Sequence, residues 1–140
     1  MTDEDLAKMI IAHEGNVPYA YKDSLGYWTI GVGFLIDKEK GGQLFPEEIE
    51  FILLNRIEKI KTDLNKNLSW FKDLDVVRQS ILIDMAFNLG VRGLLKFTNT
   101  LDLIKNKKYT EASKAMLESL WAKQVKGRAV KLSTMMKDGK

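Results

Sequence analysis

Apolar residues follow two different spacings along the chain, and each spacing predicts a different element. Over residues 2–14 they recur at intervals of three and one positions, as they do on one face of a helix. Thr2 and Asp5 have the spacing of a capping box, and Gly15 is a typical residue at a helix end. We therefore expect an N-terminal helix over about residues 2–14.

The next segment, over about residues 15–45, is rich in Tyr, Trp, Val, Ile and Gly. Its central part reads VPYAYKDSLGYWTIGVGFLID. Short runs of β-branched and aromatic residues separated by Gly, Asp and Ser are typical of strands joined by tight turns. This pattern predicts a small sheet, with DSLG as one of its turns.

From Pro46 onward the pattern is helical again. Pro46, Glu47 and Glu48 suit a first helical turn, and an apolar stripe follows them, so we expect one long helix over about residues 46–66. The further helices expected are about 75–89 closed by Gly90, about 98–106 capped by Thr98, about 110–123 capped by Thr110, and a last one from about Arg128.

This order of elements predicts an α+β fold, in a single domain of residues 1–140. A small β lobe would span about residues 15–45, and the long helix of about 46–66 would link it to a larger helical lobe. That lobe would comprise about residues 67–140 together with helix 2–14. The cleft between two such lobes is where we expect a ligand.

The composition excludes several classes of protein. The chain has 140 residues, of which 45% are hydrophobic and 29% are charged, as in a single globular domain. It has no cysteine and one histidine, so a disulfide framework and a thiolate zinc site are excluded. We expect no cofactor and no metal. The acidic first residues resemble neither a secretory signal nor a membrane span.

Charge is distributed unevenly between the two parts of the sequence. Residues 1–50 contain four basic and ten acidic side chains, a net charge of −6, whereas residues 51–140 contain 18 basic and nine acidic, a net charge of +9. The basic side chains either solvate helix faces or attract a polyanion such as a bacterial envelope. No combined aromatic and basic motif supports nucleic-acid binding, so we expect none.

Three side chains between residues 13 and 33 have the chemistry of an acid–base site. Glu14 stands where the first helix ends, and the negative end of the helix dipole favours a protonated carboxyl there. Asp23 lies in a polar turn that favours its ionised form. Two carboxyl groups in contrasting surroundings are typical of glycoside hydrolysis. Thr29 could bring a hydroxyl beside Asp23 and help to hold a water molecule.

This stretch resembles the active-site region of the T4-type phage lysozymes, glycoside hydrolase family 24. The family has a Glu, an Asp nine residues later and a Thr six residues after that, as at Glu14, Asp23 and Thr29, between an EG pair and a TIGVG segment. AFNLG, FTNTL, a Trp and GRA then follow in the family's order, so the resemblance extends over nearly the whole chain.

The resemblance implies a muramidase that cleaves the β-1,4 bond between N-acetylmuramic acid and N-acetylglucosamine in peptidoglycan. Glu14 would be the general acid, and Asp23 with Thr29 would position the attacking water. The family inverts the anomeric carbon, which implies carboxyl groups roughly 6.5–9.5 Å apart. Arg128 in GRA matches an arginine that supports the catalytic Glu. Its charge would favour ionised Glu14, against the helix-end effect, and the sequence leaves that balance open.

Substrate contacts follow from the same resemblance. Leu35, Phe87 and Thr100 match positions that contact the saccharide. The chain departs from the family pattern at Phe34, where histidine is common, at Ala115, where an asparagine contact is lost, and in the segment 37–45, which is short.

The expected biological role is that of a monomeric endolysin that lyses a bacterial host at the end of phage infection. It would stay in the host cytoplasm until a holin opens the membrane, and then reach peptidoglycan in the periplasm or cell wall. The alternative is a cell-wall-binding module that has lost turnover. Intact Glu14, Asp23 and Thr29 favour the enzyme.

Overall fold

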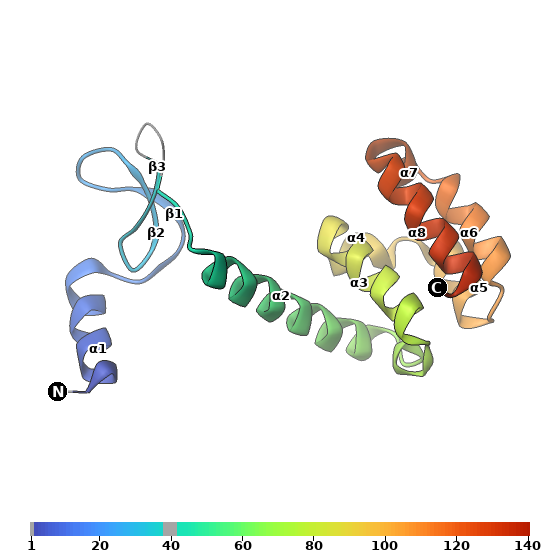
Figure 1. Cartoon of the computed structure of the whole chain (residues 1–140), viewed down its shortest axis with the longest axis horizontal. Coiled ribbons are helices and arrows are strands. Elements are labelled where there is room, and N and C mark those ends of the chain that lie inside the picture. The colour runs from blue at the N-terminus through green and yellow to red at the C-terminus, as the bar shows by residue number, and fades with distance from the viewer. Residues whose placement is uncertain (1, 38–41) are drawn as a thin grey trace. The chain divides into compact units, whose positions relative to one another are not determined.

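The computed structural model describes residues 2–37 and 42–140, which belong to two compact units, 1–50 and 51–140 (Figure 1). The first contains helix α1 (Asp3–Glu14) and a three-stranded antiparallel sheet. The second is helical, and the long helix α2 (Pro46–Asn67) extends across the boundary between them. The predicted α+β class is confirmed, and the long helix begins and ends within one residue of its predicted bounds.

The capping box predicted at the start of α1 is present. The Thr2 hydroxyl accepts a hydrogen bond of 3.1 Å from the backbone N–H of Asp5, and the Asp5 carboxylate accepts one of 3.1 Å from the backbone N–H of Thr2. The hydrogen bonds from Thr2 hold the pKa of Asp5 below its ordinary value. At the other end, Gly15 has a φ of 85° and closes the helix, as expected.

The sheet consists of β1 (Val17–Lys22), β2 (Trp28–Gly31) and β3 (Phe34–Asp37), paired in that order. Thr29 in β2 lies opposite Tyr21 in β1 and Leu35 in β3. Residues directly opposite one another project from the same face of a sheet. Thr29, Tyr21 and Leu35 therefore share one face, and the predicted DSLG turn joins β1 to β2.

The second unit stacks short helices against one another. They are η1 (Phe71–Asp73), α3 (Val76–Leu89), α4 (Val91–Leu95), α5 (Thr98–Lys105), α6 (Tyr109–Leu117), α7 (Leu120–Val125) and α8 (Gly127–Asp138). Helix α6 packs against α5, α7 and α8, and α3 packs against α4 and α8; Figure 1 shows the orange and red helices side by side. None of the helices in the described residues is long and apolar enough to span a membrane.

All of the buried hydrophobic residues among those described belong to the second unit, and they form one core. They are Leu64, Leu68, Phe71, Ile81, Leu82, Met85, Ala86, Leu94, Leu101, Ile104, Ala112, Met116, Trp121, Ala122, Ala129, Leu132 and Met136. In the first unit Thr29 is the one buried residue among residues 2–36 and 42–50, for which exposure is described. The two units thus differ sharply in how much apolar surface each buries by itself.

Two predicted helix caps were wrong, although both helices begin within one residue of the predicted position. Thr98 is the first residue of α5 and Thr110 the second of α6, and neither hydroxyl caps its helix; the N-cap residues are Phe97 and Lys108. A capping residue has non-helical backbone geometry, as Phe97 and Lys108 do, whereas both threonines already lie within their helices.

The predicted helix over about 110–123 is in fact two helices, α6 and α7. Ser119 interrupts it with an extended ψ of 156°, and its hydroxyl accepts a hydrogen bond of 3.1 Å from the backbone N–H of Ala122. The short elements η1 and α4 were not predicted. Their few residues leave no room for a helical periodicity.

Arg78 joins three helices of the second unit. Its Nε donates to the carbonyl oxygen of Met136 (2.8 Å) and its Nη2 to that of Lys137 (3.2 Å), at the C-terminal end of α8. Its guanidinium carbon lies 3.5 Å from the ring centre of Tyr109 in α6. Its Nη1 donates to Asp75, the N-cap of α3 (3.1 Å).

The carboxyl group of Asp75 is held in its ionised form. Partial burial alone would raise its pKa, but hydrogen bonds from the backbone N–H and guanidinium of Arg78, with the charge of Arg78, lower it below the ordinary value. A lowered pKa in the folded state means that Asp75 contributes stability above the pKa of the unfolded chain. That contribution is lost as the pH falls through the folded-state pKa.

We predict that Asp75→Ala destabilises the protein by about 1–2 kcal/mol at pH 7, because it removes a helix cap. The loss should be smaller at pH 3, where a larger fraction of the wild-type carboxyl is protonated than at pH 7. Urea unfolding at both pH values measures the difference. Asp73→Ala removes a nearby carboxylate that has no hydrogen bond or ion pair among the described residues, so it serves as the control. An equal cost at pH 7 and pH 3 would rule out the ionised cap.

Candidate active site

The carboxyl group of Glu14 lies against the turn between β2 and β3. Glu14 is the last residue of α1, and a Cβ atom placed on Gly33 would be only 2.6 Å from its Oε2 and 3.1 Å from its Cδ. Gly33 also has a φ of +68°, a conformation that residues with a side chain rarely adopt. Glycine therefore suits position 33 in its conformation, and a side chain there would displace the carboxyl group of Glu14.

Asp23 is fixed in the turn that follows β1. Its Oδ1 accepts hydrogen bonds of 2.9 Å from the backbone N–H groups of Leu25 and Tyr27. This is the geometry in which an aspartate organises a turn around its own side chain. Among the described residues, no hydrogen-bond donor contacts the second oxygen, Oδ2. One oxygen of the carboxylate thus holds the turn, and the other remains available as an acceptor.

The Thr29 hydroxyl is buried and also has a defined partner. It donates a hydrogen bond of 3.1 Å to the carbonyl oxygen of Tyr27, and the side chain of Thr29 is 4% exposed. The same carbonyl accepts a hydrogen bond of 2.8 Å from the backbone N–H of Asp23. The backbone of Tyr27 therefore connects Asp23 and Thr29. Sequence reasoning missed Tyr27, because a contact made by backbone atoms leaves no signal in the residue type.

The chemistry of the free Asp23 oxygen and of the Thr29 hydroxyl suits the binding of a water molecule. A carboxylate accepts hydrogen bonds, and a hydroxyl that already donates its hydrogen can only accept more. A water molecule bound to Oδ2 of Asp23 and Oγ1 of Thr29 would donate both of its hydrogens. One of its lone pairs would then stay free for attack on an electrophilic carbon.

The β2–β3 hairpin brings Leu35 close to these groups. Leu35 lies opposite Thr29 on the same sheet face, and the turn of this hairpin meets Glu14. Phe34 pairs with Ile30, and its ring contacts Gly31. Since neighbouring residues of a strand project to opposite faces, Phe34 points away from Thr29 and Leu35. The short segment 37–45 lies partly outside the described residues.

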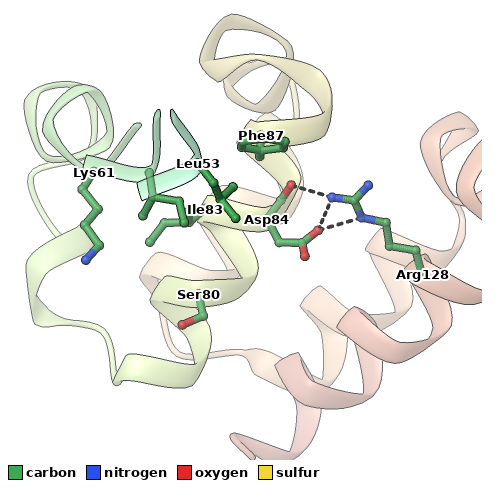
Figure 2. Close-up of a pocket in the computed structure, with 8 residues that line it drawn as sticks. Leu53, Lys61, Ser80, Ile83, Asp84, Phe87 and Arg128 are labelled. Carbon is green, nitrogen blue, oxygen red and sulfur yellow. Dashed lines mark hydrogen bonds and ion pairs between the residues drawn. The ribbon is translucent and has the colours of Figure 1, made fainter. Parts of the chain in front are cut away.

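Phe87 and Arg128 line one pocket of about 390 Å³ in the helical unit (Figure 2). Arg128 is bound there to Asp84: its Nε and Nη2 each lie 2.7 Å from Oδ1, and Nη2 donates to the carbonyl oxygen of Asp84 at 3.2 Å. Leu53, Ile57 and Ile83 form apolar walls beside the half-exposed ring of Phe87, and Lys61 and Ser80 complete the lining.

A second pocket of the same unit, about 310 Å³ in volume, brings together Thr100 and Ala115. Asn99, Ser119 and Glu118 line it as well. Hydroxyl, amide and carboxylate groups suit the hydroxyl and acetamido groups of a saccharide. The sequence therefore still supplies polar groups around Ala115, where the asparagine contact of the family is missing.

Besides Tyr27, two residues important to this geometry were absent from the sequence-based candidates. Gly33 could have been found, since GVG between two strands indicates a close approach of the backbone to another group. Asp84 could not, because it pairs with a residue 44 positions away and the sequence around it has the pattern of an ordinary helix. The roles predicted for Glu14, Asp23, Thr29 and Arg128 stay predictions.

Comparison with known proteins identifies the family of this chain. The sequence model of the phage lysozyme family matches residues 11–137. The chain belongs to the phage lysozyme family. A Probable T4-type lysozyme 1 from Dictyostelium discoideum is 30% identical over 94% of this chain and 92% of its own length. A second Dictyostelium discoideum protein, Probable T4-type lysozyme 2, is 27% identical over 96% and 94%.

The Pre-baseplate central spike protein of Enterobacteria phage T4 is also similar, at 28% identity over 96% of this chain but only 28% of its own length. The predicted resemblance is thus confirmed. As a member of this family the chain is a lysozyme, a glycoside hydrolase of the muramidase type that degrades peptidoglycan.

We predict that Gly33→Ala lowers the rate of peptidoglycan hydrolysis at least about tenfold, because the new methyl group displaces the Glu14 carboxyl and a misplaced catalytic group costs about that much or more. Clearance of a peptidoglycan suspension measures the rate. Gly90→Ala is the matched control: its φ is +77°, and a Cβ there has no neighbour within 4 Å. Gly90→Ala should strain the backbone as Gly33→Ala does, but it should leave the rate of peptidoglycan hydrolysis unchanged. Equal losses in both variants would show that strain alone is responsible.

Proposed function

We propose that this lysozyme is a phage endolysin that hydrolyses the β-1,4 bond between N-acetylmuramic acid and N-acetylglucosamine with inversion, for lysis of a bacterial host. The observation that carries the proposal is the paired arrangement at Asp23 and Thr29. Among the described residues, one oxygen of the Asp23 carboxylate has no hydrogen-bond donor, and the Thr29 hydroxyl can only accept further hydrogen bonds. Asp23 accepts a hydrogen bond from the backbone N–H of Tyr27, and Thr29 donates one to its carbonyl oxygen. Such a pair favours a bound water over direct attack by the carboxylate.

Glu14 is the proposed general acid. It comes from a different element than Asp23, and the turn that it contacts, residues 31–33, contains only Gly and Val. Its proton would be donated to the leaving oxygen of the glycosidic bond while the water attacks the opposite face of the sugar. The two carboxyl groups of an inverting enzyme are separated by roughly 6.5–9.5 Å to admit that water. Arg128 is proposed to support Glu14 through its charge.

The proposed substrate contacts are Leu35, Phe87 and Thr100. Leu35 shares a sheet face with Thr29, and the half-exposed ring of Phe87 offers an apolar surface for a sugar ring. As an endolysin the protein would work as a monomer, stay in the cytoplasm of the host, and reach the wall only after a holin opens the membrane.

We predict that Glu14→Gln reduces hydrolysis by roughly 10²–10⁴-fold, because it keeps the shape of the side chain and removes the proton to be donated. Purified wild type and variant are incubated with isolated peptidoglycan, and the products are reduced with borohydride and identified by mass spectrometry. Wild type should release fragments that end in reduced N-acetylmuramic acid. Proton NMR of the first product should show the α-anomer if the enzyme inverts.

The same pair of proteins tests the biological role. In bacteria that also express a holin, wild type should lyse the cells and Glu14→Gln should not. Lysis without the holin would contradict the proposed route. Binding of both proteins to peptidoglycan without cleavage would instead support the cell-wall-binding alternative.

We predict a different pattern for Thr29. Thr29→Val keeps the size of this buried side chain but removes the hydroxyl, so kcat should fall by about one to two orders of magnitude while KM changes little, as expected when a group acts mainly in the transition state. Thr29→Ser restores the hydroxyl and should recover most of kcat. Equal kcat values for the Val and Ser variants would exclude a role for the hydroxyl in holding the water.

A further inference from the structure

A shallow pocket of about 260 Å³, here called the Trp70 pocket, lies beside α5 in the second unit. Its apolar lining consists of Trp70, Leu68, Leu95 and Leu101, and its polar lining consists of Thr98, Asp102 and Lys105. Pockets that enclose a whole small ligand measure roughly 300–1,000 Å³. The Trp70 pocket is smaller, so it suits one unit of a polymer that is also bound elsewhere.

The Trp70 pocket adjoins the pocket that contains Thr100. Thr98, the first residue of α5, belongs to the lining of both. Thr100 is one of the proposed contacts of the saccharide, and both pockets lie within the second unit. A glycan strand bound at Thr100 can therefore reach the Trp70 pocket by passing Thr98.

The polar groups of the Trp70 pocket are free to bind a ligand. Within the part of the chain that the structure describes, four groups lack a hydrogen bond or an ion pair: the indole N–H of Trp70, the Thr98 hydroxyl, the Asp102 carboxylate and the Lys105 ammonium group. Trp70 is half-buried, but no half-buried or buried residue among those described has an unpaired side-chain nitrogen or oxygen shielded from water. The indole N–H of Trp70 therefore reaches solvent.

The charges in the pocket favour a neutral polar ligand. Asp102 and Lys105 have opposite charges and are not paired with each other. An anionic ligand would be repelled by the carboxylate, and a cationic ligand by the ammonium group. An N-acetylated sugar is neutral, and its hydroxyl and amide groups both donate and accept hydrogen bonds. The apolar face of its ring suits the leucines and the aromatic ring of Trp70.

We propose that the Trp70 pocket is an accessory saccharide site, which binds an N-acetylated sugar unit of the peptidoglycan glycan strand in addition to the contacts at Thr100. The inference rests on the proposed function, in which Thr100 contacts the same strand. A pocket this shallow binds a single sugar weakly. A strand held at the adjoining pocket keeps its next units at a high local concentration, so the accessory site strengthens binding of the polymer.

The first test follows the indole N–H signals of the ¹⁵N-labelled Glu14→Gln protein by NMR while the tetrasaccharide of N-acetylglucosamine is added. The chain has three tryptophans, and Trp70→Phe identifies the signal of Trp70. We expect that signal to shift saturably. Trp121 is the internal reference, because its indole N–H donates to Asn88 at 2.9 Å and the residue is 3% exposed. Its signal should not move.

The second test removes the carboxylate of the pocket. Asp102→Ala deletes a hydrogen-bond acceptor, so the tetrasaccharide should bind about two- to tenfold more weakly. In the otherwise wild-type enzyme, the KM for peptidoglycan should rise to the same degree while kcat changes far less. A contact made equally in the ground state and in the transition state affects binding alone.

The matched control is Glu111→Ala, which removes an exposed carboxylate from the neighbouring helix α6. Glu111 has no ion pair in the described ranges and lines neither pocket. This variant should bind the tetrasaccharide and hydrolyse peptidoglycan as wild type does. The NMR spectra also show whether each variant is folded, and the titration of Trp70 decides the matter if Asp102→Ala is not.

The proposal is overturned if the tetrasaccharide leaves the Trp70 signal in place, or if Asp102→Ala weakens binding no more than Glu111→Ala does. A Trp70 signal that responds to the free stem peptide of peptidoglycan but not to the tetrasaccharide would also overturn it, and would assign the pocket to a peptide. If wild type releases no reducing ends from peptidoglycan, the proposed function itself fails. The Trp70 shift in the Glu14→Gln protein needs no turnover, so the two failures are distinguishable.

Discussion

The close approach of Glu14 to a peptide backbone is the constraint on which the first unit is built. The Glu14 carboxyl group lies against the β2–β3 turn at Gly33, where a side chain would displace it. The strands on either side of the turn then carry Thr29 and Leu35 to one sheet face. The ten-residue β2–β3 hairpin thus contacts the proposed acid and carries both the buried hydroxyl of Thr29 and the apolar side chain of Leu35. Asp23 is connected to the Thr29 hydroxyl through hydrogen bonds with the backbone of Tyr27.

In the second unit two arginines connect α3 to the two ends of α8. Arg78 extends from the start of α3 to the last carbonyl groups of α8, and Arg128 extends from the start of α8 to Asp84 in α3. The helices are therefore antiparallel, and each guanidinium satisfies backbone carbonyl oxygens as well as a carboxylate. Arginine suits both positions because its planar fork can donate in several directions at once. The same contacts that orient α8 hold Arg128 in the wall of its pocket.

The sequence was informative where local chemistry decides the structure. Thr2 was recognisable because its hydroxyl binds the N–H group three positions ahead, and the long apolar stripe located α2. Thr98 and Thr110 were misread, since a threonine inside the first turn resembles one that caps it. The family motif gave Glu14, Asp23 and Thr29, but not the partner of Arg128. That partner depends on how α8 packs on α3, which no spacing along the chain encodes.

The uneven burial of the two units has a consequence for motion. Residues 2–36 and 42–50 bury one polar side chain, while the helical unit has a continuous apolar core. Protection of backbone amides against hydrogen exchange follows the apolar area that must be exposed to open a segment. Backbone amides of α1 and the sheet should therefore exchange through local openings of low free-energy cost. Those of α3, α6 and α8 should exchange only when the unit unfolds almost completely. The hairpin that carries the proposed chemistry would then lie in the more pliable part of the molecule, where a polymeric substrate can be admitted without loosening the core.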